Sequence, residues 1–362
     1  MLIISYRIFY IVTAGEFCVP TFDEIKDTGV AALCRVGVPE AAANTQMALL
    51  LEAEMRGVAS HGLLRLPRVI ERVKNGVTDT KATGNLVWDG TALGRMDGQN
   101  GLGPVVAANA VEAACARAAD TGTATIAIKN CDHLGMLAWY AEQIAEKGFV
   151  AICLTISEAL VHPWGGRHAL IGTNPIAIGV PCAGQPFVMD MATSLVSMGK
   201  VHDHANRNVP IPEGWALDAD GDPTTVAADA KHGAIAPFGG PKGYALGLAF
   251  EVLVAALTGS AIGTDVTGTL DSESTCNKGD VIIVMKPETG GAQAVATYLD
   301  ALRNSPPADP AQPLRIPGDR ALHIRQDALD RGLTLDPEVW KIIQTLAKSS
   351  DQNSPKEQPH AS

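Results

Sequence analysis

Hydrophobic residues near the N-terminus repeat at helical spacing. Thr21 and Glu24 form a capping box for a helix that runs to about Arg35. An Ala- and Leu-rich helix is predicted from Pro39 to Gly57, and a third helix from Leu66 to Lys74. The first part of the chain is therefore predicted to be helical and compact.

From residue 81 to about residue 237, short apolar runs replace the long helical ones. Residues 123–128 predict a buried strand, residues 134–147 a helix closed by Gly148, and residues 149–156 another strand. Strand, helix and strand in this order form a crossover unit, and α/β proteins place their chemistry at the C-terminal ends of such strands. His133 stands at such an end, and its imidazole titrates near neutral pH without help.

Further elements are predicted on both sides of this unit. We expect a helix at residues 107–119, strands at 176–180, 187–189 and 281–285, and helices again after Gly291. Residues 203–234 are rich in turn formers and predict a surface excursion. The apolar run 244–257 predicts a buried helix that ends at Gly259.

Composition narrows the class of protein. A chain of 362 residues is too long for one ordinary core, so two domains are expected, and 46% hydrophobic and 19% charged residues are typical of a globular protein. A net charge of −11, without a block of Lys or Arg, argues against nucleic acid as a partner. The seven cysteines contain no C-x-x-C pair, which argues against disulfides and zinc and for a reducing cytoplasm.

The two chain ends differ from the rest in composition. Residues 1–12 are apolar, contain Arg7 and are too short to span a bilayer. We interpret residues 1–18 as a disordered extension, with a cryptic signal segment as the alternative. No other segment is expected to cross a membrane, and the polar residues 348–362 predict a disordered tail.

The motif Ser60-His61-Gly62-Leu63-Leu64-Arg65 lies between two predicted helices. His61 and Arg65 are four residues apart and can face one pocket, where the planar guanidinium of Arg65 would bind a carboxylate. Taken alone, the motif is explained as well by Ser60 capping a helix while Arg65 pairs with a surface acid. His133 has a similar alternative, since a histidine at a strand end often satisfies a buried carbonyl. Its setting, with Asp132 beside it and Ser157 at the end of the next strand, makes it a candidate general base.

Glycine-rich loops provide candidate anion sites. Residues 162–166 lead into 170–175, and residues 237–244, which include Lys242 and Gly243, open a helix. Backbone amides at such places attract anions, although tight turns need glycine for the same backbone angles. Residues 190–194 follow a predicted strand and offer small polar groups for a ribose or an amide, or for a helix cap.

Two other motifs are set aside. Residues 101–104 begin like a dinucleotide fingerprint, but residue 106 is Val and no good strand is predicted before them, so the Rossmann interpretation fails. His202, Asp203 and His204 lack a further ligand at suitable spacing, and a solvated loop is favoured over a metal site. No metal is expected.

Taken in order, several motifs resemble the malate/L-lactate dehydrogenase family, which is unrelated to Rossmann-type lactate dehydrogenases. The resemblance covers about residues 19–320 and rests on these segments: 56–62 with Arg65, 97–101, 133–135 with Tyr140, 172–177, 190–194, 239–243 and 316–319. It implies an NAD- or NADP-dependent oxidoreductase of small 2-hydroxy acids of the malate, sulfolactate or lactate type. Ureidoglycolate dehydrogenases and reductases of cyclic imino acids (piperideine-2-carboxylate type) belong to the same family and remain alternatives. A non-catalytic module that binds an anionic metabolite is the alternative from another class.

The resemblance also implies an architecture and a set of site residues. It implies an α/β (α+β) fold of two domains, with a non-Rossmann dinucleotide-binding central domain at 81–288. A helical domain would form from both chain ends, residues 19–80 and 289–347, and the protein would be a cytoplasmic homodimer. His133 would be the acid/base residue, with Ser60, His61, Arg65 and Ser157 near the substrate, a small 2-hydroxy or 2-oxo acid. The dinucleotide would contact the following residues: Asp190, Met191, Ala192, Thr193, Lys242, Gly243, Pro317, Gly318 and Asp319.

Local features bear on the substrate. Residues 263–271 and 276–280 resemble the sulfolactate and malate branch of the family. Pro104 and Glu158 depart from the usual pattern close to the predicted site, so they put the identity of the substrate in doubt rather than the type of reaction.

Overall fold

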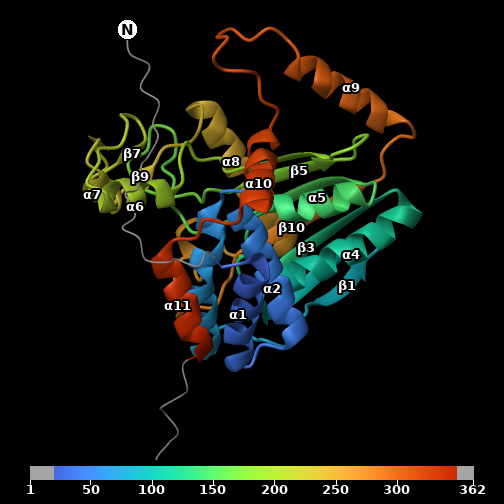
Figure 1. Ribbon diagram of the computed structural model, residues 1–362, viewed down its shortest axis with the longest axis horizontal. Helices are drawn as coiled ribbons and strands as arrows, with labels where there is room; N and C mark the ends of the chain where they lie inside the picture. The colour runs from blue at the N-terminus through green and yellow to red at the C-terminus, as the bar shows by residue number, and fades with distance from the viewer. Residues whose placement is uncertain (1–19, 349–362) are drawn as a thin grey trace, which may run out of the picture.

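The computed structural model describes residues 20–348 (Figure 1). The predicted extension at 1–18 and almost all of the predicted tail lie outside these residues. Helices from both ends of the described chain lie side by side: α11 (Pro337–Lys348) packs on α1 (Phe22–Arg35), and α10 (Asp319–Arg331) packs on α2 (Glu40–Met55). The first and last helices of the described residues therefore meet, while the exact domain boundaries stay a prediction.

The predicted N-terminal helices are confirmed. Thr21 caps α1 in the expected box, since its hydroxyl accepts from the amide of Glu24 at 3.2 Å and its own amide donates to the Glu24 carboxylate at 2.8 Å. Pro39 is the cap residue of α2, and α3 spans Leu66–Lys74 as predicted. Two short 3₁₀ helices, η1 (Ala59–His61) and η2 (Leu63–Arg65), join α2 to α3 and carry the Ser60–Arg65 motif.

A mixed sheet of seven strands forms the centre, in the order β1-β2-β3-β10-β4-β5-β6. Its strands are β1 (Asn85–Asp89), β2 (Leu93–Gly101), β3 (Thr123–Cys131), β4 (Val150–Thr155), β5 (Ile176–Val180), β6 (Phe187–Met191) and β10 (Gly279–Met285). β3 and β4 are both antiparallel to β10, which lies between them, so they are parallel to each other. The predicted crossover unit of strand, helix and strand is thus confirmed, but β10, which comes much later in the sequence, lies between its two strands. The C-terminal ends of β3 and β4 lie at one edge of the sheet.

Helices cover both faces of this sheet. α4 (Gly103–Thr121) and α5 (Ala138–Glu146) pack on one face, and α8 (Pro241–Thr258) packs on the other. Side chains of β4 alternate between them, with Cys153 in the core cluster of α4 and α5 and Leu154 in the cluster under α8. The core on the α4 and α5 face is continuous with that of the terminal helices, because Ile25, Leu33 and Ile343 belong to the same cluster.

The prediction of a buried helix at 244–257 is wrong for the isolated chain. On α8 only Gly243, Gly247, Glu251 and Val254 are buried, whereas Leu248, Val252 and Leu253 are 37%, 57% and 43% exposed. The helix also extends to 18 residues with a mean hydropathy of 1.2, enough by length and composition to cross a membrane, although no segment was expected to reach that. A soluble core helix can satisfy the same measure, and the buried Glu251 carboxylate joins α8 to two loops by accepting from the amides of Gly172, before β5, and Gly263, after α8.

Two other expectations need correction. Residues 203–234, expected to be a turn-rich surface excursion, contain more regular structure than expected: α6 (Met198–Asn206), α7 (Ala227–Ala230) and a small sheet of β7 (Ala216–Leu217), β8 (Pro223–Thr224) and β9 (Ala234–Ile235) enclose a small core with neighbouring residues such as Val161 and Ile171. The apolar residues of this core are separated by turn formers, so the sequence shows no long helical or strand pattern there.

The expectation that no good strand comes before residues 101–104 is wrong, because β2 does. A Cβ on Gly103 would nevertheless lie 2.2 Å from the His133 carbonyl oxygen, so this glycine serves close backbone packing and leaves no space for a pyrophosphate.

The helix after His133 begins at Ala138, four residues later than predicted. Gly135 has a φ of +79°, and a Cβ there would lie 2.2 Å from Cδ2 of Leu49. The segment between β3 and α5 is therefore an irregular loop, and it is this loop that presents His133. The remaining elements are η3 (Gly263–Asp265) and α9 (Gly291–Arg303).

Candidate active site

A cavity of about 1490 Å³ lies where the terminal helices, the small subdomain and the edge of the sheet meet. It brings together most of the predicted site residues, namely Ser60, His61, Arg65, His133, Ser157, Asp190, Met191, Ala192, Pro317, Gly318 and Asp319. Thr193, Lys242 and Gly243 do not line it. Ligand pockets usually measure about 300–1,000 Å³, so this space suits a ligand larger than a small acid alone.

Two imidazoles stand next to each other at one end of the cavity. The ring centroids of His61 and His133 are 5.4 Å apart, with an angle of 46° between the ring planes. The amide of Gly135 donates to Nδ1 of His133 at 2.8 Å, and Nδ1 of His61 lies 3.0 Å from the Ser60 hydroxyl. A backbone N–H can only donate, whereas a hydroxyl can donate or accept, so the two rings are not equivalent.

Both imidazoles are held in their neutral form. Burial, followed by the charge of Arg65, lowers the pKa of His61 to about 4. The pKa of His133 lies well below its usual value because the ring is buried and because the cations Arg65, Lys278 and Arg68 lie near it. Near neutral pH the site therefore holds two uncharged rings.

Arg65 is oriented by its own loop. Its Nε donates to the Ser60 carbonyl oxygen at 2.9 Å, and within residues 20–348 it forms no ion pair. Burial and the nearby Arg68 lower its pKa to about 10, so it stays charged at neutral pH. The structure thus shows no surface acid paired with Arg65, and the guanidinium remains available for an anion in the cavity.

Ser157 and Glu158 follow the end of β4. The Ser157 hydroxyl accepts from the amide of Thr173 at 3.0 Å and lies on the cavity wall. The Glu158 carboxylate is occupied elsewhere: it accepts from the amides of Thr269 and Leu270, both at 2.8 Å, and from the Thr269 hydroxyl at 3.0 Å. The unusual acid beside Ser157 therefore holds a loop in place.

The predicted cofactor residues divide into two groups. Asp190 lies near the end of β6 on the cavity wall and caps α5 by accepting from the amide of Ala138 at 2.7 Å. Thr193 is buried, with its hydroxyl donating to the Thr173 carbonyl oxygen at 2.9 Å. Lys242 is exposed on the first turn of α8, and Gly243 is required by packing, since a Cβ there would lie 1.7 Å from the Phe238 carbonyl oxygen.

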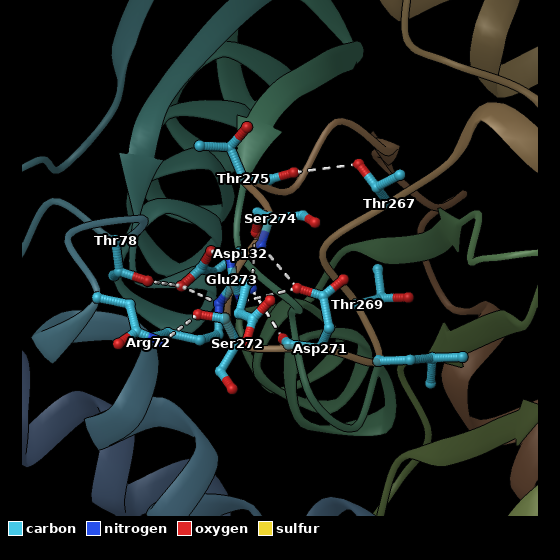
Figure 2. Close-up of polar contacts among 12 residues, drawn as sticks. Arg72, Thr78, Asp132, Thr267, Thr269, Asp271, Ser272, Glu273, Ser274 and Thr275 are labelled. Carbon is cyan, nitrogen blue, oxygen red and sulfur yellow. Dashed lines mark hydrogen bonds and ion pairs between the residues drawn. The ribbon is translucent and has the colours of Figure 1, made fainter.

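Figure 2 shows a buried clamp around Asp132, the residue before His133, that the sequence did not indicate. Arg72 on α3 pairs with Asp132 at 2.8 Å, and the Thr78 hydroxyl donates to the same carboxylate at 2.5 Å. Nη1 of Arg72 also donates to the carbonyl oxygens of Asp271 and Ser274, both at 3.0 Å. The clamp thus joins the residue before His133 to the loop 267–275, whose Thr269 lines the cavity.

We expect Glu158→Gln to loosen this loop. Loss of the charge weakens three hydrogen bonds to Thr269 and Leu270, at a cost of about 1–3 kcal/mol for hydrogen bonds to a charged group. Hydrogen exchange of amides in residues 267–275 should speed up, and the apparent affinity for substrate should fall several-fold. Glu273→Gln removes an exposed charge from the same loop and is the control; equal exchange in both variants would contradict the assignment.

Metal ligands do not gather in the described residues. Between residues 20 and 348 no group of three or more His, Cys, Asp or Glu side chains could hold an ion. His202, Asp203 and His204 lie on the helix α6 rather than in the loop that the sequence suggested.

Comparison with known proteins identifies the relatives of this chain. A family model described as malate/L-lactate dehydrogenase matches residues 21–344. The chain belongs to the malate/L-lactate dehydrogenase family. As a member, it is an oxidoreductase, and the family resemblance expected from the sequence is confirmed.

Among the relatives, the crystal structure of a dehydrogenase from Sinorhizobium meliloti is 48% identical, with a TM-score of 0.87 over 91% of this chain and 98% of that one. L-sulfolactate dehydrogenase of Methanocaldococcus jannaschii is 38% identical over 329 residues, 90% of this chain and 95% of that protein. (2R)-3-sulfolactate dehydrogenase (NADP(+)) of Chromohalobacter salexigens is 34% identical over 322 residues, 87% and 94% respectively. Reductases of cyclic imino acids also occur among the relatives.

Proposed function

We propose that this member of the malate/L-lactate dehydrogenase family oxidises a small 2-hydroxy acid, or reduces the 2-oxo acid, with NAD or NADP. The observation that carries the proposal is the arrangement of Arg65 beside two neutral imidazoles in one large cavity. A cation that binds the carboxylate and a proton acceptor next to it are what the oxidation of a 2-hydroxy acid needs. Relatives named sulfolactate and malate dehydrogenases support the choice of substrate class.

The residues present fit a dinucleotide. The Ser194 hydroxyl is buried on the cavity wall without a hydrogen-bond partner among the described residues, so a ligand can satisfy it. The N-terminal ends of α6 and α10 also border the cavity, and backbone amides at helix N-termini favour phosphate groups. Asp190, Met191, Ala192 and Pro317–Asp319 line the cavity and would hold the cofactor. Lys242 and Gly243 do not line the cavity in a single chain, so a second subunit would have to bring them to the cofactor. When bound, the nicotinamide supplies the hydride chemistry.

The hydrogen bonds of the two rings suggest separate roles. Because the Gly135 amide occupies Nδ1 of His133, the neutral ring carries its proton on Nε2 and acts as a donor to the reacting oxygen of the substrate. The Ser60 hydroxyl can accept from Nδ1 of His61, which leaves Nε2 of His61 free to take the hydroxyl proton. His133 therefore remains a catalytic residue in this proposal, but His61 becomes the proton acceptor.

The function is tested by absorbance at the nicotinamide band with NAD and NADP, using malate, sulfolactate, lactate and piperideine-2-carboxylate. We expect turnover with at least one hydroxy acid. Imine reduction without turnover of any hydroxy acid would establish the imino-acid reductase instead. If no substrate reacts and NADH fluorescence does not change on titration with the protein, the non-catalytic module is the correct interpretation.

We further propose that the protein is a homodimer joined through the exposed face of α8. Val252 and Leu248 lie on one apolar stripe of this helix, a surface that isolated soluble proteins seldom leave open. Val252→Asp should weaken association by about 100-fold or more, since a charge would be buried in an apolar interface. Light scattering after size exclusion should show a monomer, whereas Val87→Asp, at a 62% exposed residue of β1, should leave the dimer intact. A monomeric wild-type protein would overturn this proposal.

A further inference from the structure

Two arginines beside His133 carry charges that no carboxylate neutralises. Arg65 ends η2 and Arg68 lies in the first turn of α3, and both line the cavity at the end that holds His133. Within residues 20–348 neither of them forms an ion pair. Neighbouring arginines do, since Arg56 pairs with Glu52 and Glu142, and Arg72 with Asp132.

The nearby acids are already engaged elsewhere. Glu158 holds Thr269 and Leu270, and Asp132 is bound by Arg72 and Thr78. Glu71, the acid on α3 that also borders the cavity, accepts from the Ser272 hydroxyl at 2.7 Å. None of these carboxylates is within ion-pair distance of Arg65 or Arg68, so the positive charge is left for a ligand.

Spacing places the backbone positions of Arg65 and Arg68 on one side of the helix, and both side chains line the cavity. Residues three apart lie on the same face, and three residues advance a helix by about 4.5 Å. This rise separates the backbone positions of the two arginines, and their long side chains can reach two acid groups at the ends of a short carbon chain. The charge of Arg68 contributes to lowering the pKa of both Arg65 and His133, after burial in each case, which agrees with its lying close to both.

A substrate with one acid group would satisfy only one of these arginines. The 2-carboxylate needs a single bidentate guanidinium, for which Arg65 is already oriented by the Ser60 carbonyl oxygen. Lactate or a cyclic imino acid would then leave Arg68 unpaired in a half-buried site. A second anionic group on the substrate would neutralise it and make the site electrostatically complementary.

We propose that Arg68 binds a second acidic group, so that the substrate is a 2-hydroxy acid bearing a carboxylate or a sulfonate at its far end. The inference rests on the proposed dehydrogenase function and assigns its substrate class. It also makes Arg68 the residue that separates diacids from monoacids at this site.

The test compares steady-state kinetics of Arg68→Met with malate, sulfolactate and lactate. Arg68→Met should raise KM for the preferred diacid by about 30-fold or more and change kcat less, because the lost contact binds ground state and transition state alike. The kcat/KM for lactate, already low, should change by less than about 3-fold. Malate and sulfolactate distinguish a distal carboxylate from a distal sulfonate, and a preference for either supports the proposal.

Controls separate this inference from the function on which it rests. Lys74→Met removes an exposed charge from the same helix and should leave KM unchanged, whereas Arg68→Lys should restore part of the affinity for the diacid. Wild-type enzyme that oxidises lactate as well as malate, or Arg68→Met that affects both alike, would overturn the role of Arg68 and leave the dehydrogenase function standing. Absence of turnover with every hydroxy acid would instead overturn the proposed function.

Discussion

Replacing His61 with glutamine should lower kcat for 2-hydroxy-acid oxidation by about 10²–10⁴-fold, the usual contribution of a positioned proton acceptor. The same replacement at His133 should cost far less. A glutamine amide can still donate a hydrogen bond from near the position of Nε2, which is all that the proposed role of His133 requires. At His61 the amide cannot take a proton, so the chemical step loses its base.

Alanine variants and cofactor binding are the controls for this pair. His133→Ala removes the donor itself and should lower turnover by orders of magnitude, with NADH binding by fluorescence unchanged. If His133→Gln is as inactive as His133→Ala while His61→Gln keeps its activity, His133 is the base, as the family resemblance implies. That result would require the ring to release the Gly135 amide during the reaction.

The pH profile gives an independent readout of the proton acceptor. Oxidation uses the neutral form of His61, whose pKa is lowered to about 4 by burial and by Arg65. The value of kcat/KM reports on the free enzyme and the free substrate. With a substrate whose acid groups stay ionised, it should therefore stay level as pH falls from 7 through 5 and decline only on approaching 4. Arg65, Arg68 and Lys278 are the cations around the two rings, and Asp132 and Asp280 are each paired with a cation. A decline centred near the ordinary pKa of histidine would contradict this arrangement.

The sequence predicted the parts of the fold that depend on local signals. The capping box at Thr21, the glycine after α8 and the β-branched strand that ends before His133 each act within a few residues. The Ser60–Arg65 motif and His133 also share one cavity, as expected. Their convergence could be anticipated because they lie at a helix junction and at a strand end, where the family resemblance places them.

Other features depend on partners distant in the sequence. Arg72 reads as a surface residue of α3, yet its partners are at Asp132 and in the loop 267–275. Arg68 follows Arg65 at helical spacing, a signal that was available but has no meaning until both are known to border the same cavity. The exposure of α8 could not be predicted either, because its apolar run reads as a core helix whether another helix or a second subunit covers it.

A buried ion pair in the sheet leads to the second large effect. Lys278 and Asp280 pair with each other, and their side chains are 1% and 0% exposed. Asp280 lies on β10 opposite Ile128 of β3 and Thr155 of β4, the two strands that lead to His133 and Ser157. Burial is the largest single influence and opposes the charge of Lys278, but the Asp280 carboxylate, together with the sulfurs of Cys276 and Cys131, raises the pKa of the ammonium group overall. The pair therefore stays charged at the centre of the fold.

Lys278→Met should lower the free energy of unfolding by about 3–5 kcal/mol, because it leaves the Asp280 carboxylate buried without its partner. Urea unfolding followed by circular dichroism measures the loss. Burial raises the pKa of Asp280, so in the variant the acid can protonate in the native state, and the loss should be largest at pH 8 and shrink as the pH falls. Adding Asp280→Leu removes the stranded charge, and the double variant should recover most of the stability. A double variant as unstable as Lys278→Met would mean that the loss comes from poorer packing around residue 278 rather than from the unpaired carboxylate.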